Sequence, residues 1–198
     1  AGFDWKIIGP DYDKQWLDYV AWQSDEDAYN ASGQKCSAQS ILFIHRNWAA
    51  RLLPNLAELA ARRSLDDLSI GPVLTWSNER IKKHVAAALA VPGAELLFGG
   101  KPLSGHEIPD CYGAWEPTAV RVPLEAICGE HFGLLTTELF GPFQVVVTYG
   151  DGELDKVLDV FERISQHLTA AVVSADPVFQ QKTAYAMSLS VSWARRCV

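Results

Sequence analysis

Apolar residues follow two patterns along this chain. In some stretches they form short continuous runs, which are typical of buried strands; in others they recur every three or four positions, which is typical of amphipathic helices. The continuous runs and their β-branched residues predict extended segments at 40–45, 71–75, 94–98, 118–122, 143–149 and 169–174.

The helical spacing defines five further segments. The first helix is expected at 16–28, after the potential capping residues Asp11 and Asp13, and Gly33 should end it before a loop at 33–36. The second contains residues 52–59, with Pro54 acceptable only in its first turn. The others are expected from Ser77 to Pro92, from about 151 to 168, and from about 176 onward.

Strands that alternate with helices indicate an α/β fold with a largely parallel, twisted sheet. The segment 99–118 is rich in glycine, proline and polar residues, and we interpret it mainly as loop. No repeat, low-complexity segment or linker interrupts the 198 residues, so a single domain over 1–198 is predicted.

Composition narrows the classes of function. The chain has 17 Lys and Arg against 24 Asp and Glu, a net charge of -7, and no basic cluster, so nucleic acid is not an expected partner. No apolar run approaches the ~20 residues of a membrane span. The 4 cysteines contain no C-x-x-C pair, so neither a metal site nor a disulfide scaffold is expected.

Cys36 is the first candidate for chemistry. It lies in the predicted loop between a helix and a buried strand, where catalytic groups are often carried. Lys35 would favour its thiolate, and Gly33 would permit a backbone turn that aims the Cys36 N–H at an oxyanion. The alternative is a buried structural thiol. Spacing and composition alone do not decide between the two.

Four motifs, in order along the chain, resemble the aldehyde dehydrogenase superfamily. Gly33-Gln34-Lys35-Cys36-Ser37-Ala38 resembles its nucleophile motif, and the Lys-Cys-Ser version is similar to the 1-pyrroline-5-carboxylate (glutamate semialdehyde) dehydrogenase branch. The others are the hairpin-like residues 93–100, the Glu116-Pro117-Thr118 strand start and Glu138-Leu139-Phe140-Gly141-Pro142. Residues 3–6 and 45–48 further resemble the plant-type branch, and the likeness covers about 1–175.

The resemblance implies a three-layer catalytic domain and NAD-dependent oxidation of an aldehyde. Cys36 would be the catalytic nucleophile, forming a thiohemiacetal and then a thioester. Glu138 would hydrogen-bond the nicotinamide ribose, Phe140 would pack on the nicotinamide ring, and Ser37 would contact the substrate. The alternative interpretations, without a role in function, are a solvated loop charge for Glu138, a core aromatic for Phe140 and a strand-start hydroxyl for Ser37. No histidine is assigned a role, and Gln34 is interpreted as a loop-shaping amide.

Glutamate γ-semialdehyde, oxidised to glutamate in proline catabolism, is the implied substrate. The implied location is the mitochondrial matrix, otherwise the cytoplasm, and the full-length form is expected to be a homo-oligomer. NAD and NADP are not distinguished.

Three parts of the family pattern are absent from residues 1–198. The general-base glutamate is expected before residue 1, the N-terminal cofactor-binding domain with its glycine-rich turn is missing, and 178–198 departs from the pattern. We therefore expect little or no turnover from the isolated chain. Two other classes stay open: a cysteine hydrolase that pairs Cys36 with a distant histidine, and a non-catalytic truncated or assembly module.

Overall fold

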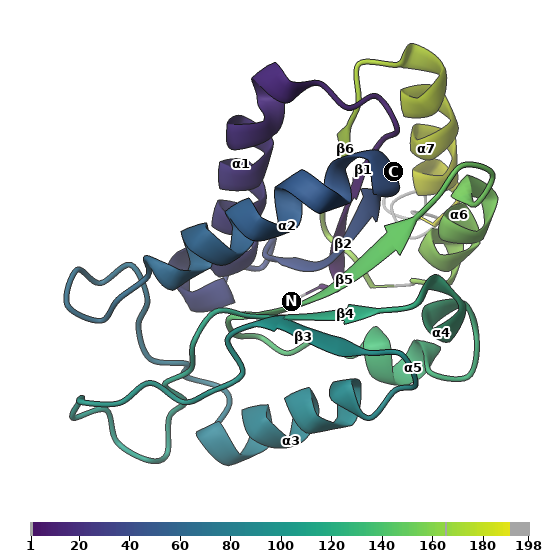
Figure 1. Ribbon diagram of the computed structural model, residues 1–198. Coiled ribbons are helices and arrows are strands. Elements are labelled where there is room, and N and C mark those ends of the chain that lie inside the picture. Colours follow the sequence, from purple (N-terminus) through teal and green to yellow (C-terminus); the bar gives the residue numbers. More distant parts are fainter. Residues whose placement is uncertain (1, 165, 191–198) are drawn as a thin grey trace, which may run out of the picture.

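A six-stranded sheet forms the centre of the protein (Figure 1). The computed structural model describes the backbone of residues 2–164 and 166–190 and side chains as far as 185. The spatial order is β3-β4-β5-β2-β1-β6, and every pairing is parallel except that of β3 with β4. The strands are β1 (Asp4–Ile8), β2 (Gln39–His45), β3 (Glu95–Phe98), β4 (Thr118–Val122), β5 (Phe143–Tyr149) and β6 (Ala170–Val173).

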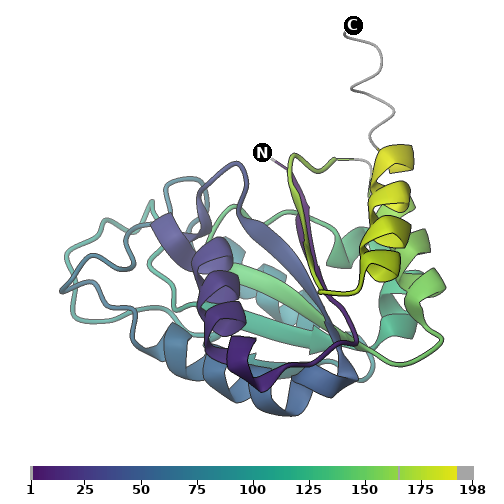
Figure 2. The ribbon, with the colours of Figure 1, turned by 90° about the horizontal axis from the view of Figure 1, so that it is seen from above.

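Helices cover both faces of the sheet, which confirms the predicted three-layer α/β architecture (Figures 1 and 2). On one face, α1 (Leu17–Tyr29) and α2 (Arg46–Ala61) pack in a core with β2 and β5. The larger core on the other face includes residues of the remaining helices. The helices of this second layer are α3 (Asn78–Leu89), α4 (Leu124–Cys128), α5 (Phe132–Leu135), α6 (Leu154–Arg163) and α7 (Pro177–Ser190).

Strand β1 was not predicted from the sequence. Its residues Asp-Trp-Lys-Ile-Ile place two charged side chains in a strand whose five residues are all buried. Both charged groups have local partners, because Lys6 Nζ lies 2.6 Å from Asp27 Oδ2 on α1 and one oxygen of the Asp4 carboxylate accepts from two backbone N–H groups. Burial of a charge is tolerated only with such partners.

The position of Pro54 differs from the prediction. It lies in the interior of α2, beyond the first turn. A proline there leaves the carbonyl four residues earlier without its helical hydrogen bond. Pro54 and Ala50 are both exposed, so water can satisfy that carbonyl, and the helix continues.

Two predictions near the C-terminal end are corrected. Leu168 does not belong to the amphipathic helix, which ends at Arg163, and its side chain is 61% exposed. Strand β6 is present as predicted, but it is half-buried at the edge of the sheet instead of fully buried. The expected turn after β3 is also longer, because β3 pairs with β4 across residues 99–117. Among the described residues, no helix combines the length and hydropathy needed to cross a membrane.

Candidate active site

Three of the four motifs are brought to one end of the sheet by its topology. Strands β4, β5 and β2 are parallel neighbours, so their amino ends lie at the same edge. Residues 33–38 precede β2, residues 138–142 precede β5, and Glu116 and Pro117 precede β4. Segments more than 100 positions apart in the sequence therefore meet at this edge (Figure 2).

The Cys36 loop, residues 33–38, and the Glu138–Pro142 segment are in direct contact. Gly33 has φ +67°, and a Cβ placed on it would lie 2.2 Å from the carbonyl oxygen of Gly141. Ala31 and Ser32 also adopt positive φ values of 54° and 57°. Such backbone strain in residues other than glycine persists only where surrounding contacts hold it, and it is common at functional sites.

Side chains of the loop hold this strained backbone in place. Ser32 Oγ accepts from Gly71 N at 2.7 Å and donates to the Gly71 carbonyl. Gln34 Nε2 donates to the Pro72 carbonyl, and its Oε1 accepts from Leu74 N, both at 2.8 Å. The predicted loop-shaping role of Gln34 is confirmed, because its amide joins the loop to residues 72–74.

A buried chain of hydrogen bonds crosses the three strands directly behind the motifs. Tyr29 Oη donates to the Thr118 carbonyl at the start of β4. Gln144 Nε2 in β5 donates to Tyr29 Oη at 2.8 Å, and Gln39 Nε2 in β2 donates to Gln144 Oε1 at 2.7 Å. Burial of the Tyr29 hydroxyl raises its pKa well above the usual range, so this hydroxyl remains a proton donor. This chain of hydrogen bonds fixes the relative positions of the strand ends that carry the site.

Cys36 is exposed at the tip of its loop, so the alternative of a buried structural thiol is wrong. Lys35, expected to favour the thiolate, directs its ammonium to the Glu26 carbonyl at 3.2 Å. Ser37 is also exposed and contributes to a polar cavity at the amino end of β1. These positions leave the thiol and the neighbouring hydroxyl open to a reactant.

Glu138 and Phe140 are half-buried in the segment before β5. Glu138 lines a cavity of about 330 Å³ together with Phe132, Thr136 and Arg163. The Phe140 carbonyl lies 3.4 Å from Thr75 Oγ1, which ties the segment to residues 71–75. Phe140 is not a member of the described hydrophobic cores, so the alternative interpretation of this residue as a core aromatic is wrong.

The pattern-based search missed a second group of polar residues at this edge. Asp4, Lys6 and Gln39 are all buried and line the same cavity as Ser37. Burial lowers the pKa of Lys6, while its contact with Asp27 acts in the opposite direction. The one signal in the sequence is a pair of charges inside an otherwise apolar strand.

Comparisons with known proteins agree with this arrangement. The profile of the Aldehyde dehydrogenase family matches residues 5–195. The chain belongs to the aldehyde dehydrogenase family.

Members of this family with similar sequence include plant proteins. The chain is 56% identical over 185 residues to mitochondrial delta-1-pyrroline-5-carboxylate dehydrogenase 12A1 of Arabidopsis thaliana, covering 92% of this chain and 33% of that protein. It is 58% identical to a probable aldehyde dehydrogenase of Linum usitatissimum, with the same coverage. This aldehyde dehydrogenase chain therefore spans about a third of the length of the curated relatives it matches.

Solved structures show the same fold. A variant of Bradyrhizobium japonicum proline utilization A has a TM-score of 0.76 at 26% identity, covering 94% of this chain and 18% of that one. The delta-pyrroline-5-carboxylate dehydrogenase of Mycobacterium tuberculosis has a TM-score of 0.74 at 22% identity, covering 95% of this chain and 33% of that one.

Proposed function

We propose that this chain carries the nucleophile, and one side of the nicotinamide site, of a dehydrogenase that oxidises glutamate γ-semialdehyde to glutamate with NAD. The observation that carries the proposal is the contact of the Cys36 loop with the Glu138–Pro142 segment through Gly33 and Gly141. It joins an exposed thiol to the two side chains that the resemblance assigns to the cofactor. The similarity to plant delta-1-pyrroline-5-carboxylate dehydrogenase supports the choice of substrate.

The residues fit one side of a nicotinamide nucleotide. A carboxylate such as that of Glu138 can accept hydrogen bonds from two vicinal hydroxyls, and the Phe140 ring offers an apolar surface for a flat heterocycle. Both are in one segment, beside the nucleophile loop. When bound, the nicotinamide supplies the two-electron oxidation by taking hydride from the aldehyde carbon.

Cys36 performs the covalent steps. Its thiolate attacks the aldehyde carbon, a C–S bond forms, and the carbonyl electrons move to oxygen, where the Cys36 N–H can stabilise the oxyanion. Loss of hydride from that carbon leaves a thioester on Cys36. Water then attacks the thioester, the C–S bond breaks, and the acid and the thiolate are released, with one proton passing to the general base. The overall balance is aldehyde, NAD⁺ and water to acid, NADH and H⁺.

The contacts of the histidines favour the dehydrogenase over the alternative of a cysteine hydrolase. His45 lies 3.2 Å from Asp151, His106 contacts Leu103 and Ile108, and His84 packs against Phe143. His131 lies near Glu130, and His167 lies near the Ile164 carbonyl. No hydrogen bond between a histidine and Cys36 occurs among the described residues.

We also propose that the whole protein lies in the mitochondrial matrix and forms a homo-oligomer. The mitochondrial location of the similar Arabidopsis protein supports the first of these two proposals. The chain of 198 residues alone is expected to turn over little or no substrate.

The test is an assay of a longer protein that matches the full length of the curated relatives. NADH formation from glutamate γ-semialdehyde should fall by about 10³-fold or more in Cys36→Ser, as expected for loss of a covalent nucleophile. Glu138→Gln should raise KM for NAD more than it lowers kcat. Cys111→Ser removes another exposed thiol and is the matched control. Retained activity in Cys36→Ser, or a wild type that hydrolyses esters but forms no NADH from glutamate γ-semialdehyde, would contradict the proposal.

A further inference from the structure

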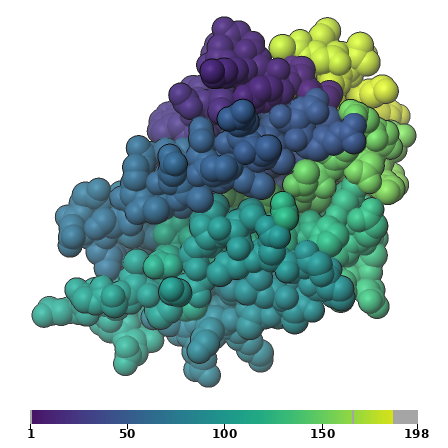
Figure 3. All heavy atoms as spheres, viewed as in Figure 1, coloured from purple at the N-terminus to yellow at the C-terminus, as the bar shows by residue number. Residues whose placement is uncertain are grey.

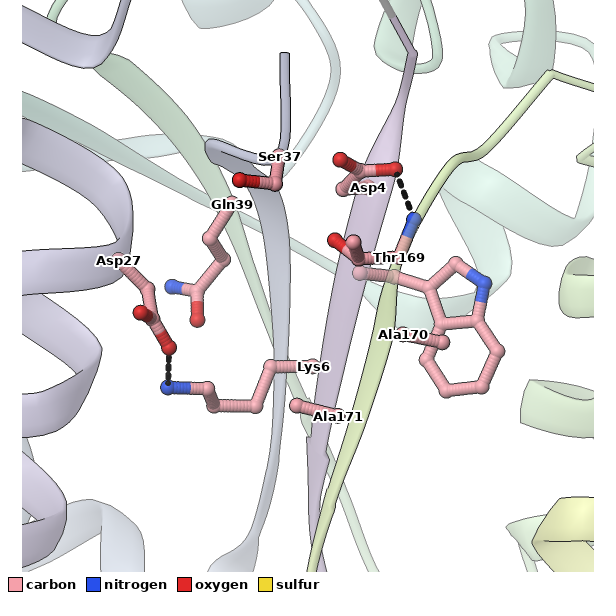
Figure 4. A pocket seen from close by; sticks show the side chains of 9 residues that line it. Asp4, Lys6, Asp27, Ser37, Gln39, Thr169, Ala170 and Ala171 are labelled. Atoms are coloured by element: carbon pink, nitrogen blue, oxygen red, sulfur yellow. Dashed lines mark hydrogen bonds and ion pairs between the residues drawn. The ribbon is translucent and has the colours of Figure 1, made fainter. Parts of the chain in front are cut away.

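A polar cavity of about 260 Å³ lies at the amino end of β1, next to the nucleophile loop (Figure 4). Its polar lining comes from β1, β2, α1, the loop before β2 and the residue before β6: Asp4, Lys6, Asp27, Ser37, Gln39 and Thr169. Ser37 follows the nucleophile Cys36 directly, so an occupant of this cavity is a neighbour of the reacting thiol.

Asp4 directs an unused oxygen into this cavity. The side chain is 1% exposed, and its Oδ1 accepts from the backbone N–H groups of Leu168 and Thr169 at 2.6 and 2.9 Å. Its Oδ2 is buried and has no hydrogen-bond partner. Figure 4 shows the bonded oxygen facing β6 and the other oxygen turned toward the side of Ser37.

Gln39 presents a second oxygen without a partner, and the direction of its amide is fixed by the chain of hydrogen bonds through Gln144 and Tyr29. The Thr118 carbonyl can only accept, so Tyr29 Oη must donate to it and must accept from Gln144 Nε2. Gln144 Oε1 therefore accepts from Gln39 Nε2. Gln39, which is 4% exposed, is left with Oε1 buried and unpartnered.

The cation already present does not satisfy these acceptors. Lys6 Nζ donates to Asp27 Oδ2 at 2.6 Å and to Ser24 Oγ at 3.4 Å. The pair of Lys6 and Asp27 is neutral overall, which leaves the Asp4 carboxylate as the uncompensated charge of the cavity. Buried acceptors without partners are rare in native proteins and call for a donor from elsewhere.

We propose that this cavity binds a primary ammonium group, with Asp4 Oδ2 and Gln39 Oε1 as acceptors and the Ser37 hydroxyl as a third. An ammonium has three N–H donors, no acceptor and one positive charge, which matches two unpaired acceptors, a hydroxyl and one excess carboxylate. No cluster of three or more His, Cys, Asp or Glu suited to a metal ion is found among the described residues.

Under the proposed function, on which this assignment rests, the ammonium is the α-amino group of the amino-acid aldehyde. Asp4 and Gln39 then determine specificity for aldehydes that carry an amine. Ser37, already assigned to the substrate by resemblance, would connect that amine-binding cavity to the reacting end.

The first experiment measures binding to the 198-residue chain without any turnover. Ethylammonium chloride is titrated into ¹⁵N-labelled protein, and the amide signals of Leu168, Thr169 and the Gln39 side chain are followed. Saturable shifts are expected in the wild type, and Asp4→Asn should weaken binding about tenfold or more, as for a lost charge-assisted hydrogen bond. Asn retains an acceptor for the two backbone N–H groups, so the fold should survive.

Asp11→Asn is the matched control, because this carboxylate lies beyond the other end of β1 and both its oxygens are occupied, by Ser174 Oγ and Ala175 N. It should bind ethylammonium as the wild type does. Potassium chloride and ethanol are titrated in parallel. Equal shifts with potassium, equal shifts with ethanol, no saturable shift at all, or unchanged binding in Asp4→Asn would each overturn the ammonium assignment.

The second experiment uses the longer enzyme and two aldehydes, glutamate γ-semialdehyde and glutarate semialdehyde, which lacks the amine. Asp4→Asn should lower kcat/KM for the aminated aldehyde about 30-fold and change that for the other less than about threefold. Equal losses on both would make Asp4 merely structural and overturn the specificity role. A wild type that oxidises neither aldehyde would contradict the proposed function, and the binding titration would still decide the cavity.

Discussion

At Gly33 a single missing side chain allows two distant motifs to touch. A similar positive φ, +79°, occurs at Gly152, where a Cβ would meet nothing within 4 Å. Alanine substitution at these two glycines therefore separates two contributions to the loss of stability. An unfavourable backbone conformation is present at both positions, and a collision with the Gly141 carbonyl is present only at Gly33.

We expect Gly152→Ala to lower the free energy of unfolding by about 1 kcal/mol, the cost of a left-handed alanine. Gly33→Ala should lower the free energy of unfolding by about 3 kcal/mol or more, because the backbone of the Cys36 loop must also move. Denaturant unfolding of the two variants measures the difference. Equal losses would show that the loop and the Glu138–Pro142 segment do not depend on this close approach.

The described cysteines should also differ in reactivity. Cys36 and Cys111 are exposed, whereas Cys128 is half-buried and has its pKa raised by burial and by the charge of Glu125. A raised pKa lowers the thiolate fraction near neutral pH, so Cys128 should be alkylated last of the three. Peptide mapping after brief treatment with limiting iodoacetamide measures the order, and we expect Cys36 first. Labelling of Cys36 no faster than Cys128 would contradict an accessible nucleophile; Cys197 lies outside the described residues.

At this scale the sequence reveals residue types more readily than their partners. Cys36, Ser37, Glu138 and Phe140 were found through motifs. Nothing local to residues 4–8 shows that Lys6 is matched by Asp27, 21 positions away. Long-range pairing of polar groups leaves no periodic signal in a single sequence.

At the scale of elements, helix α3 is anchored to the sheet partly through a histidine. The His84 ring packs edge-on against Trp76 and against Phe143, the first residue of β5, with centroids 6.0 and 5.1 Å apart. Burial lowers the pKa of His84 below its ordinary value of 6.5. The folded protein therefore binds a proton at His84 more weakly than the unfolded chain does.

This difference gives stability a pH dependence of known sign. Below the unfolded pKa of 6.5, the unfolded chain binds more protons, so stability falls as pH drops, until the lower folded pKa is passed. A tenfold weakening of proton binding corresponds to about 1.4 kcal/mol. His84→Phe keeps an aromatic ring and should flatten the slope measured by urea unfolding across this range. His45, whose pKa burial also lowers, should leave a residual slope. An unchanged slope would contradict the role of His84.

Elements were predicted where one pattern dominated. Apolar runs located β2 and β5, and the spacing of apolar residues after Ser77 located α3. The predictions were wrong where tertiary contacts decide the outcome. Helix α2 continues through Pro54, where both Pro54 and Ala50, whose carbonyl loses its helical donor, are exposed, and Leu168 lies beyond a helix that ends at Arg163.

At the scale of the molecule, the surface carries aromatic side chains on α1 and the turn before it. Trp16, Tyr19 and Trp22 are 54%, 55% and 47% exposed, and neighbouring rings lie 6.3 and 6.0 Å apart. Figure 3 shows α1 at an outer corner of the space-filling view, in the purple part of the chain. A contiguous aromatic surface of this kind is typical of an interaction site.

We expect the chain to self-associate through this surface. Sedimentation velocity at several concentrations should show a mass that rises with concentration, and a Trp16→Ser/Trp22→Ser variant should stay closer to monomer. Leu68→Ser is the control, because Leu68 is 84% exposed but is not part of the aromatic group. A monomer at all concentrations, or an equal effect of Leu68→Ser, would contradict the prediction.

The place of β1 in the sheet has a consequence for how the protein is made. Strand β1 is synthesised before the other five strands of the sheet, yet it pairs with β2 on one side and with β6 on the other, where Ile8 lies opposite Val173. The buried charges of β1 therefore lack their last neighbours until the segment before β6 has been synthesised. These neighbours include the Leu168 and Thr169 amides that donate to Asp4. Such sequence-distant pairing folds slowly and leaves strand edges open meanwhile. A nascent chain stalled before β6 would expose one edge of β1, which makes it a natural client for chaperones.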